Sequence, residues 1–186
     1  MEELIQGKKF LLFFRRLADA GSKAADKLKF QTEHAIKMEK EKEATKTKDG
    51  IINSLSDGEN TIDIKSFAYT SDERTAAIWK ELRKYFKAGD VVEIWQVDLT
   101  SKGKNDQKYE AEYFQGYFTS FEISASADSQ VELSMTYAIN GNGAESKDTL
   151  TSGQEQAVSD VLYKYKSMAL GGAESEETKK ENSFEM

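Results

Sequence analysis

The chain of 186 residues contains no cysteine and no proline, and His34 is its single histidine. The lack of cysteine excludes disulfides, zinc–thiolate sites and thiol nucleophiles, and a single imidazole excludes any site that needs two. Average usage of about 5% would predict several prolines. Without them, the turns of this chain must be formed by Gly, Asn, Asp and Ser.

Basic residues are in deficit, since 26 Lys and Arg stand against 33 Asp and Glu and the net charge is −7. A general nucleic-acid binder normally carries a basic surface, so this class of protein is not favoured. The same charge suits a surface that DNA slides past, because a negative wall repels phosphate.

Long apolar runs are absent as well. No stretch approaches the roughly 18 residues needed to span a membrane. The apolar residues 10–14 follow two lysines but are too few for the core of a signal peptide. We therefore expect a protein with no membrane segment that is made and kept in a cytoplasm.

Two features of the sequence could carry chemistry. His34 could join a serine and an aspartate, but the chain has no G-x-S-x-G motif. His34 also lies in an alternating strand pattern, so we interpret it as structural. Glutamates alternate with lysines over residues 39–43, as a metal site or an acid–base pair could require. No apolar residue lies near enough to push their pKa values apart, so a solvated charged face is the better interpretation. The sequence predicts no enzyme, no cofactor and no metal site.

Alternating polar and apolar residues predict strands over most of the chain. The connections between consecutive strands are short, which implies antiparallel pairing. The length suits one domain with an extra lobe or tail. The predicted strands are residues 8–16, 28–38, 60–69, 91–98, 109–124 and 131–137.

Two segments show helical rather than strand spacing. Residues 70–87 predict the main helix, with Thr70 and Glu73 as a capping box and Gly89 as its end. Residues 151–168 predict a second helix. The weaker capping box of this second helix consists of Thr151 and Gln154.

These elements indicate a mainly β fold with α: an antiparallel β-sandwich or barrel, flanked by one main helix and followed by a C-terminal helix. We expect one domain over residues 1–168 and a disordered acidic tail at residues 169–186. Residues 39–56, which begin with a dense run of charges, are predicted to project as a solvated loop or as the exposed end of a hairpin. The alternatives are an arm that orders against a partner and a helical extension without a buried stripe.

The predicted strand at residues 109–124 carries aromatic residues on both faces, and we expect a bulge near Gly116. Alternation places Tyr109 and Phe121 on one face and Phe114 on the other. Stacking on nucleic-acid bases is not favoured, because the segment has almost no basic residues. Core packing on one face and a subunit contact on the other explain the pattern better. The candidates for these contacts are Trp95, Tyr113, Phe114, Tyr117, Phe118 and Phe121.

Six groups of residues occur in an order that is informative as a set, although no single group is specific. They are Gly7–Lys9 with Leu11–Arg15, Phe30–His34, Thr47–Gly50, Val92–Trp95, Gln115–Tyr117 with Thr119–Glu122, and Val131–Ser134 with Ala138–Gly141. This ordered set resembles the major tail protein (tail tube protein) family of long-tailed phages, the siphophages, of Gram-positive bacteria. The resemblance covers residues 7–165, and the acidic tail has no counterpart in it.

The resemblance implies a virion protein that is assembled in the cytoplasm of the bacterial host. Six subunits form a ring, the rings stack, and one sheet of each subunit joins a continuous barrel around the lumen. DNA passes through this lumen without specific binding. The implied partners are identical subunits, a tape-measure protein, and the tail terminator and distal tail proteins. The implied inter-ring arm has as its candidates Glu39, Lys40, Glu41, Lys42, Lys46, Lys48 and Asp49.

Two other functions stay open from the residues alone. One is a monomeric β-sandwich binding module, either tail-associated or carbohydrate-binding. The other is a small hydrolase with paired carboxylates, which the absence of a plausible site disfavours. Light scattering with imaging tests the first alternative, and a screen for glycan hydrolysis tests the second.

Overall fold

The computed structural model describes residues 2–71 and 77–159, and residues 1, 72–76 and 160–186 lie outside the described part. Strands dominate it. The body strands are β1 (Phe10–Arg16), β2 (Asp26–Lys27), β3 (Gln31–Lys37), β6 (Thr61–Phe67), β7 (Val92–Asp98), β8 (Tyr109–Ser124), β9 (Glu132–Ile139) and β10 (Ala144–Asp148). The remaining elements are the hairpin strands β4 (Lys40–Thr47) and β5 (Gly50–Asp57), the helices α1 (Ile78–Ala88) and α2 (Ser152–Ser159), and short 3-10 turns at Gly7–Lys9 and Leu17–Asp19.

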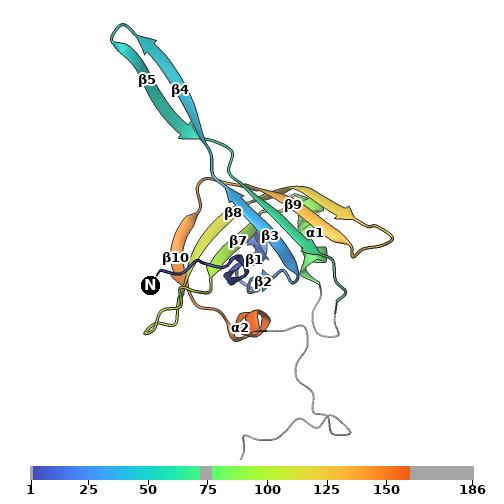
Figure 1. The fold of residues 1–186 in the computed structure, drawn as a ribbon. Coiled ribbons are helices and arrows are strands. Elements are labelled where there is room, and N and C mark those ends of the chain that lie inside the picture. Colours follow the sequence, from blue (N-terminus) through green and yellow to red (C-terminus); the bar gives the residue numbers. More distant parts are fainter. Residues whose placement is uncertain (1, 72–76, 160–186) are drawn as a thin grey trace, which may run out of the picture.

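The body strands form one antiparallel sheet in the order β2–β1–β7–β8–β9–β6–β3, with β10 also paired to β8. The two halves of β8 belong to different layers. Residues 110–116 pair with β7, whereas residues 117–124 pair with β9 and with no other strand in the described part of the chain. The sheet therefore folds over into two sandwich-like layers, β2–β1–β7–β8–β10 and β8–β9–β6–β3, rather than a closed barrel (Figure 1). This architecture confirms the mainly β, sandwich-like fold with two helices.

The change of layer within β8 has a local cause. The register against β9 shifts between Phe118 and Ser120, which is beyond the predicted bulge position at Gly116. Gly116 has a different purpose. A Cβ atom at this position would lie 1.9 Å from the carbonyl oxygen of Ala138 and 3.1 Å from the ring of Tyr137. Only glycine lets the two strands approach so closely.

The main core lies between the two layers. Phe14, Phe114 and Tyr137 are among its largest fully buried side chains. The Tyr137 hydroxyl donates a 2.6 Å hydrogen bond to the carbonyl oxygen of Val92 and so ties the layers together. Burial raises the pKa of Tyr137, which keeps this hydroxyl a neutral donor. From α1, the core also receives the buried residues Ile78, Leu82 and Tyr85.

Helix α1 ends where predicted but begins later than predicted. Gly89 ends it with a φ of 70°, a left-handed conformation that favours glycine. The N-cap is Ala77 rather than Thr70, and the Ala77 N–H donates to the Ser71 hydroxyl oxygen at 3.0 Å. The predicted capping box was therefore wrong as the start of α1, because the helix begins only where its buried face begins. Glu73, the other half of that box, lies outside the described residues.

A second, smaller apolar cluster covers the opposite face of the β1–β7–β8 layer. Phe13 and Val97 are buried in it, and Leu150 and Val158 pack against them from the segment that contains α2. The sequence predicted that the strand at residues 109–124 would be apolar on both faces, with a neighbouring subunit covering one of them. The chain itself supplies part of the cover that we had assigned to a neighbouring subunit.

Helix α2 begins with the predicted capping box. The Thr151 N–H donates to Gln154 Oε1 at 2.8 Å, and the Gln154 N–H donates to Thr151 Oγ1 at 3.2 Å. The rest of the predicted helix and the tail at residues 169–186 lie outside the described residues. Neither of the helices described is long and apolar enough to cross a membrane.

Three body strands depart clearly from the prediction: β3 begins later than predicted, and the two-residue β2 and the strand β10 lie outside every predicted strand. β3 begins at Gln31 rather than at Leu28, because Phe30 has a φ of 55° and breaks the extended backbone. Leu28 is buried, whereas Phe30 turns its ring to the surface against Tyr69. β10 was not predicted at all. Its five residues are all exposed and show no apolar alternation, so periodicity could not reveal it.

Candidate assembly surface

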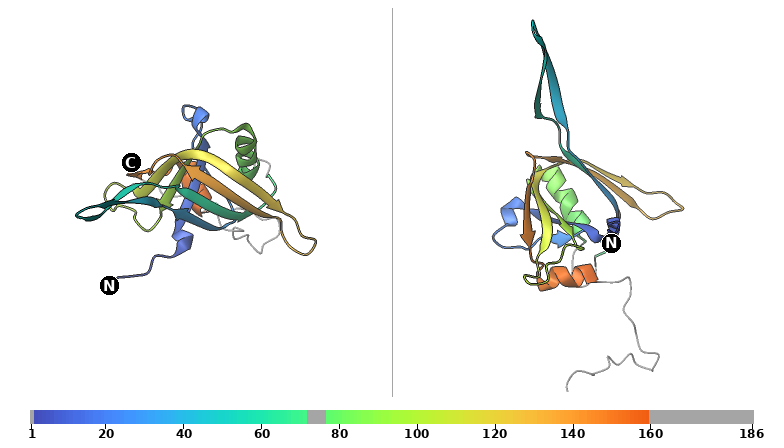
Figure 2. Two further views of the ribbon diagram at one scale, coloured as in Figure 1. Left: turned by 90° about the horizontal axis from the view of Figure 1, so that it is seen from above. Right: turned by 60° about the vertical axis from the view of Figure 1, so that its left-hand side comes forward.

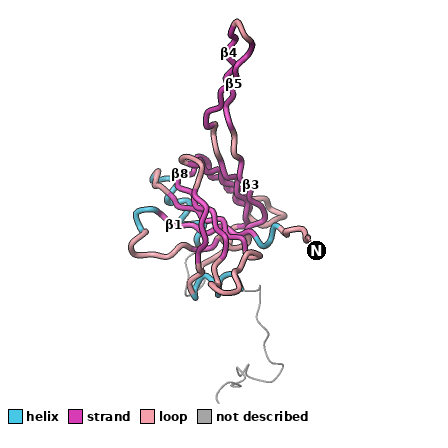
Figure 3. The backbone as a smooth tube through the Cα atoms, turned by 90° about the vertical axis from the view of Figure 1, so that its left-hand side faces the viewer, coloured by secondary structure: helices cyan, strands magenta, loops and turns pink. Residues whose placement is uncertain are grey.

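The hairpin of β4 and β5, residues 40–57, projects from the body, and we call it the arm (Figures 1 and 2). Its strands form a separate two-stranded sheet, paired from Lys40 with Asp57 to Thr47 with Gly50. Every residue of both strands is exposed, and a side view shows the arm standing clear of the body (Figure 3). A lone two-stranded hairpin is at best marginally stable in water. The segment thus has the shape of a projecting hairpin and the exposure of an arm that needs a partner.

Register divides the arm into two chemically different faces, because directly paired residues of antiparallel strands share a face. One face, here the basic face, carries Lys40, Lys42 and Lys46 together with the exposed apolar residues Ile51 and Leu55. Its remaining members are Ala44, Asn53 and Asp57.

The other face of the arm, here the acidic face, carries Glu41 and Glu43 with hydroxyl side chains around them. Ile52 is its one large apolar residue. Lys48 and Asp49 form the turn at the tip and belong to neither face. The seven sequence candidates for an inter-ring arm are thus divided among the two faces, the tip and, for Glu39, the base of the arm.

A buried asparagine fixes the base of the arm to the body. Asn60 is only 5% exposed. Its Oδ1 accepts the Glu39 N–H at 3.0 Å, and its Nδ2 donates to the Gly141 carbonyl oxygen at 2.9 Å and to Asn142 Oδ1 at 3.0 Å. Asn142 in turn donates to Asp57 Oδ2 at 3.1 Å. Both strands of the arm are therefore held by one network that includes the turn after β9.

Replacing Asn60 by alanine is expected to lower the free energy of unfolding by about 1–3 kcal/mol, because buried partners lose their hydrogen bonds. Urea unfolding measures this loss. Amide exchange at Glu39 should accelerate at the same time, since its acceptor is gone. The matched control is Asn53→Ala, an exposed asparagine of β5, which should stay within about 0.5 kcal/mol of wild type. Equal effects of the two substitutions would show that the base network does not hold the arm.

The layer β8–β9–β6–β3 has an unpaired strand edge on each side. β3 is the last strand of the sheet, and among the described residues it pairs only with β6. At the other side, residues 117–124 of β8 pair only with β9. Exposed edges present unpaired N–H and C=O groups that can accept another strand. This layer can therefore be extended from both sides at once.

The solvent face of that layer is mainly hydrophilic, although the exposed Tyr117 also lies on it. Lys37 pairs with Asp63 at 2.8 Å, and Lys65 pairs with Glu33 at 3.3 Å. The hydrogen bond from Lys37 lowers the pKa of Asp63, and the same pair raises the pKa of Lys37. Between these ion pairs lie hydroxyl side chains and two further acids. The other polar residues of this face are Thr61, Ser120, Glu122, Ser124, Glu132, Ser134 and Thr136.

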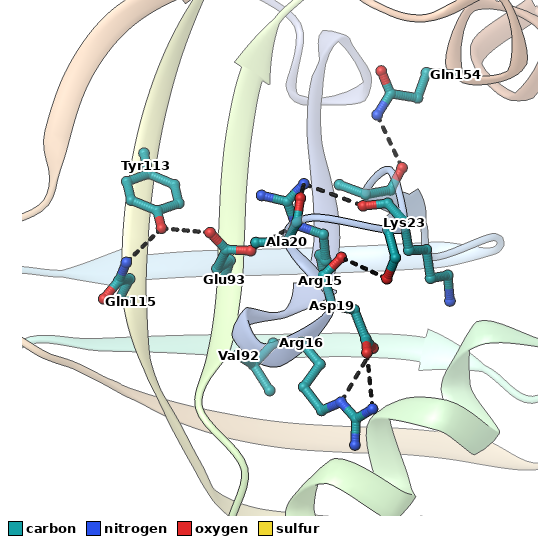
Figure 4. Close-up of polar contacts among 12 residues, drawn as sticks. Arg15, Arg16, Asp19, Ala20, Lys23, Val92, Glu93, Tyr113, Gln115 and Gln154 are labelled. Atoms are coloured by element: carbon teal, nitrogen blue, oxygen red, sulfur yellow. Dashed lines mark hydrogen bonds and ion pairs between the residues drawn. The ribbon is translucent and has the colours of Figure 1, made fainter.

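A buried carboxylate lies on the face of the β1–β7–β8 layer that is turned away from the main core (Figure 4). Glu93 is only 3% exposed. Its Oε2 accepts Arg15 Nε–H and its Oε1 accepts the Tyr113 hydroxyl, both at 2.6 Å. The Tyr113 oxygen accepts Gln115 Nε2–H, also at 2.6 Å, and the Arg15 guanidinium lies 4.9 Å from the centre of the Trp95 ring. Both oxygens of the carboxylate accept hydrogen bonds, so the cluster joins the three strands β1, β7 and β8.

The aromatic candidates from the sequence fall into three environments. Phe114 and Phe118 are buried in the main core, whereas Trp95 and Tyr113 stack on the opposite face with ring centres 5.0 Å apart. Tyr117 is exposed. Phe121 was assigned to the face of Tyr113, and this was wrong. The register shift after Phe118 turns its side chain into the core, where it stacks on Phe86 of α1.

His34 has a structural role. Its Nδ1 hydrogen-bonds Gln31 at 3.1 Å and its Nε2 hydrogen-bonds Gln96 at 2.8 Å, which links β3 to β7 across the sandwich. Burial lowers the pKa of His34. Within residues 2–71 and 77–159, no three His, Asp or Glu side chains gather in a way that could hold a metal ion.

Sequence reasoning missed two parts of this surface. Asn60 was taken only as the start of a strand, because its side-chain partners lie 81 and 82 residues away. The unpaired edge of β8 was missed because nothing in the sequence of a strand indicates where its neighbours stop. No local signal could have revealed either feature.

Comparison with known proteins gives a consistent result. The family described as phage tail tube protein matches residues 4–144. A protein of Staphylococcus phage phiMR25, provisionally named a tail protein, is 29% identical over 134 residues, which are 70% of this chain and 66% of that protein. The match thus spans slightly less than two thirds of the length of that relative.

Solved structures give the same fold. The SPP1 tail tube protein superposes with a TM-score of 0.70 at 21% identity, over 92% of this chain and 96% of that one. The tail of an empty gene transfer agent particle with C6 symmetry superposes with a TM-score of 0.56 at 16% identity, over 76% of this chain and 98% of that one. A chain from the sheath–tube complex of an extracellular contractile injection system gives a TM-score of 0.51 at 12% identity, over 81% of this chain and 95% of that one.

Proposed function

The chain belongs to the phage tail tube protein family, and from this premise we propose how its subunits close into rings and how the rings stack. It is a structural subunit of a tail tube and thus a virion component. Six subunits form a ring, as in the C6-symmetric tail that shares its fold. The observation that carries the proposal is the pair of unpaired edges on one four-stranded layer.

Ring closure uses these two edges. β3 of one subunit lies beside residues 117–124 of β8 in the next, so that main-chain hydrogen bonds continue from subunit to subunit. In a closed ring both edges of this layer are paired, which removes the aggregation risk of its exposed strand edges. A heterologous contact of this kind closes whenever the rotation between subunits completes a circle.

The solvent face of β8–β9–β6–β3 then lines the lumen. Both of its lysines are paired with acids, whereas Glu122 and Glu132 have no ion-pair partner among the described residues. The face therefore carries excess negative charge and many hydroxyl groups. Such a wall repels the phosphates of passing DNA and offers few cations to hold them.

Amide exchange tests the lateral contact. Backbone amides at the outer edges of β3 and of residues 117–124 are expected to exchange fast in the isolated subunit and to become protected in rings or tubes. β7, which is paired on both sides in the body, is the internal control and should be equally protected in both states. Unchanged exchange at both edges after assembly would contradict this contact.

The arm stacks one ring on the next. Its position outside the body, its full exposure and its rigid base at Asn60 support this assignment. In this proposal a tape-measure protein occupies the lumen during assembly in the host cytoplasm, the terminator and distal tail proteins bind the two ends, and DNA passes through later without specific binding. The protein acts without catalysis and without a cofactor.

A further inference from the structure

We infer that the basic face of the arm docks on a second copy of this chain, in a hollow formed by β7, β8 and β10, while the acidic face of the arm stays in solvent. This inference rests on the proposed stacking role of the arm and adds the surfaces that meet.

The composition of the two arm faces decides which one docks. The basic face presents Ile51 and Leu55, of which Leu55 is 69% exposed. Lys42 and Lys46 flank them, and neither has an ion-pair partner among the described residues, whereas Lys40 is paired with Asp57. Apolar side chains between uncompensated ammonium groups are typical of a contact surface that awaits an acidic partner. The acidic face, which is richer in hydroxyl groups, is typical of a solvated face.

The hollow on the body has matching chemistry. It encloses about 490 Å³ and is lined by Asp98 of β7, Glu110 and Glu112 of β8, and Glu145 and Lys147 of β10. Four carboxylates thus stand against one ammonium group. The apolar residues Phe10 and Ala111 form part of the same lining.

Two of these carboxylates repel each other in the free subunit. Glu112 and Glu145 are directly paired across β8 and β10. Burial and the nearby charge of Glu145 raise the pKa of Glu112. An ammonium group placed between them would remove this repulsion, so the hollow favours a cationic occupant.

Other hollows on the body lack this charge. The one beside α1 is lined by Arg16, Lys23 and Lys84 against Asp19, Glu81 and Asp90, and is balanced. The one beside β3 has two lysines and one glutamate in its lining, and the one beside α2 has one arginine and one aspartate. The hollow of β7, β8 and β10 is the one of the four with a large negative excess.

The placement of the two surfaces suits head-to-tail stacking. The arm leaves one end of the body, whereas the loop between β7 and β8 and the end of β10 lie at the other end (Figures 1 and 2). Asp98, Glu110 and Lys147 are at or next to those strand ends. Strands of eight residues span about 26 Å. An arm of that length can extend from one ring to a copy in the next ring and contact that copy at the end opposite its own arm. Repetition of this contact gives an open stack.

Charge reversal tests the pairing in the full-length chain. Lys42→Glu with Lys46→Glu reverses the arm, and Glu112→Lys with Glu145→Lys reverses the hollow. Each pair of substitutions is expected to reduce tube yield at least about tenfold, since like charges then face each other. The chain with all four substitutions should form tubes again, because its opposite charges meet in reversed order. Tubes are counted by negative-stain imaging, and circular dichroism checks that each variant is folded.

The matched control is Glu41→Lys with Glu43→Lys on the acidic face, which changes the net charge by as much as the reversal of the hollow. It should leave tube yield within about twofold of wild type. If this control loses its tubes while Lys42→Glu with Lys46→Glu forms normal tubes, the acidic face docks and the inference has chosen the wrong face.

The outcomes separate this inference from the proposed function. If reversal of the arm blocks stacking, but reversal of the hollow does not and the four substitutions together do not restore it, the hollow is wrong and the stacking role of the arm stands. If a chain without the arm still forms tubes, the stacking role itself fails. Rescue in the fourfold variant is the result that the inference requires.

Discussion

A chain in which residues 41–56 are replaced by two glycines is expected to fold, to close into rings and to form no tubes. The arm strands pair only with each other, and all of their residues are exposed. Their removal therefore takes nothing from the core, and the free energy of unfolding of the body should change by no more than about 0.5 kcal/mol. Stacking should be lost completely, because the arm provides the contact between rings and this chain lacks it.

Both strands of the arm have to be removed together. Deleting only residues 41–49 would leave Ile51, Ile52 and Leu55 on an unpaired strand, which favours aggregation rather than rings. Lys40 and Asp57 remain as the closing pair, so two glycines can join them. Light scattering gives the size of the particles, and imaging distinguishes rings from tubes. Tubes of normal length from this variant would contradict the role of the arm.

The second large effect is expected in the core. Phe118→Ala should lower the free energy of unfolding by about 3–5 kcal/mol, because a buried aromatic ring leaves a cavity that the sandwich can only partly close. Phe118 is 6% exposed, stacks on Phe14 and meets Tyr137 edge to face, with ring centres 6.4 and 5.5 Å away. These two neighbours come from different layers, so the loss weakens the contact between them.

The preceding residue in the chain provides the control for this prediction. Tyr117 is 42% exposed on the opposite face of β8, and Tyr117→Ala should cost less than about 1 kcal/mol in the isolated subunit. Denaturant unfolding of the two variants under the same conditions measures the difference. Equal losses would mean that β8 does not present Phe118 to the core, and that the assignment of its faces is wrong.

The strands that alternation predicts are those with one face on the core. β6 and β9 were found because buried and solvated residues alternate along them, whereas β1, β7 and β8 were found as runs rich in apolar or aromatic residues. β10 has no buried residue and left no such signal. The charged segment from Glu39 was equally silent about pairing, because every residue of β4 and β5 is exposed and no core imposes a period on them.

Side-chain direction failed at one position for a physical reason. Alternation assigns faces correctly only while the register is unbroken. The shift between Phe118 and Ser120 changes the parity of every later residue in β8. Phe121 therefore lies in the core, although the sequence pattern placed it opposite. A register shift depends on the partner strand as well as on the strand itself, so a single strand sequence does not reveal it.

Long-range polar contacts were also beyond sequence reasoning. Asn60 holds the arm through hydrogen bonds to a turn 81 and 82 residues away. Glu93 forms its ion pair with Arg15, which lies 78 residues before it. The spacing of such partners carries no periodicity. The charged sequence and the family resemblance both suggested an arm, but only the structure identifies which residues hold its base and how its charged and apolar residues divide between two faces.

The most direct test of the central claim is electron cryomicroscopy of the purified chain at high concentration. We expect hollow tubes of stacked six-fold rings, with β8–β9–β6–β3 of each subunit facing the lumen and the arm density entering the next ring. Particles that remain monomeric at every concentration, or rings lined by the β1–β7–β8 layer instead, would contradict the account.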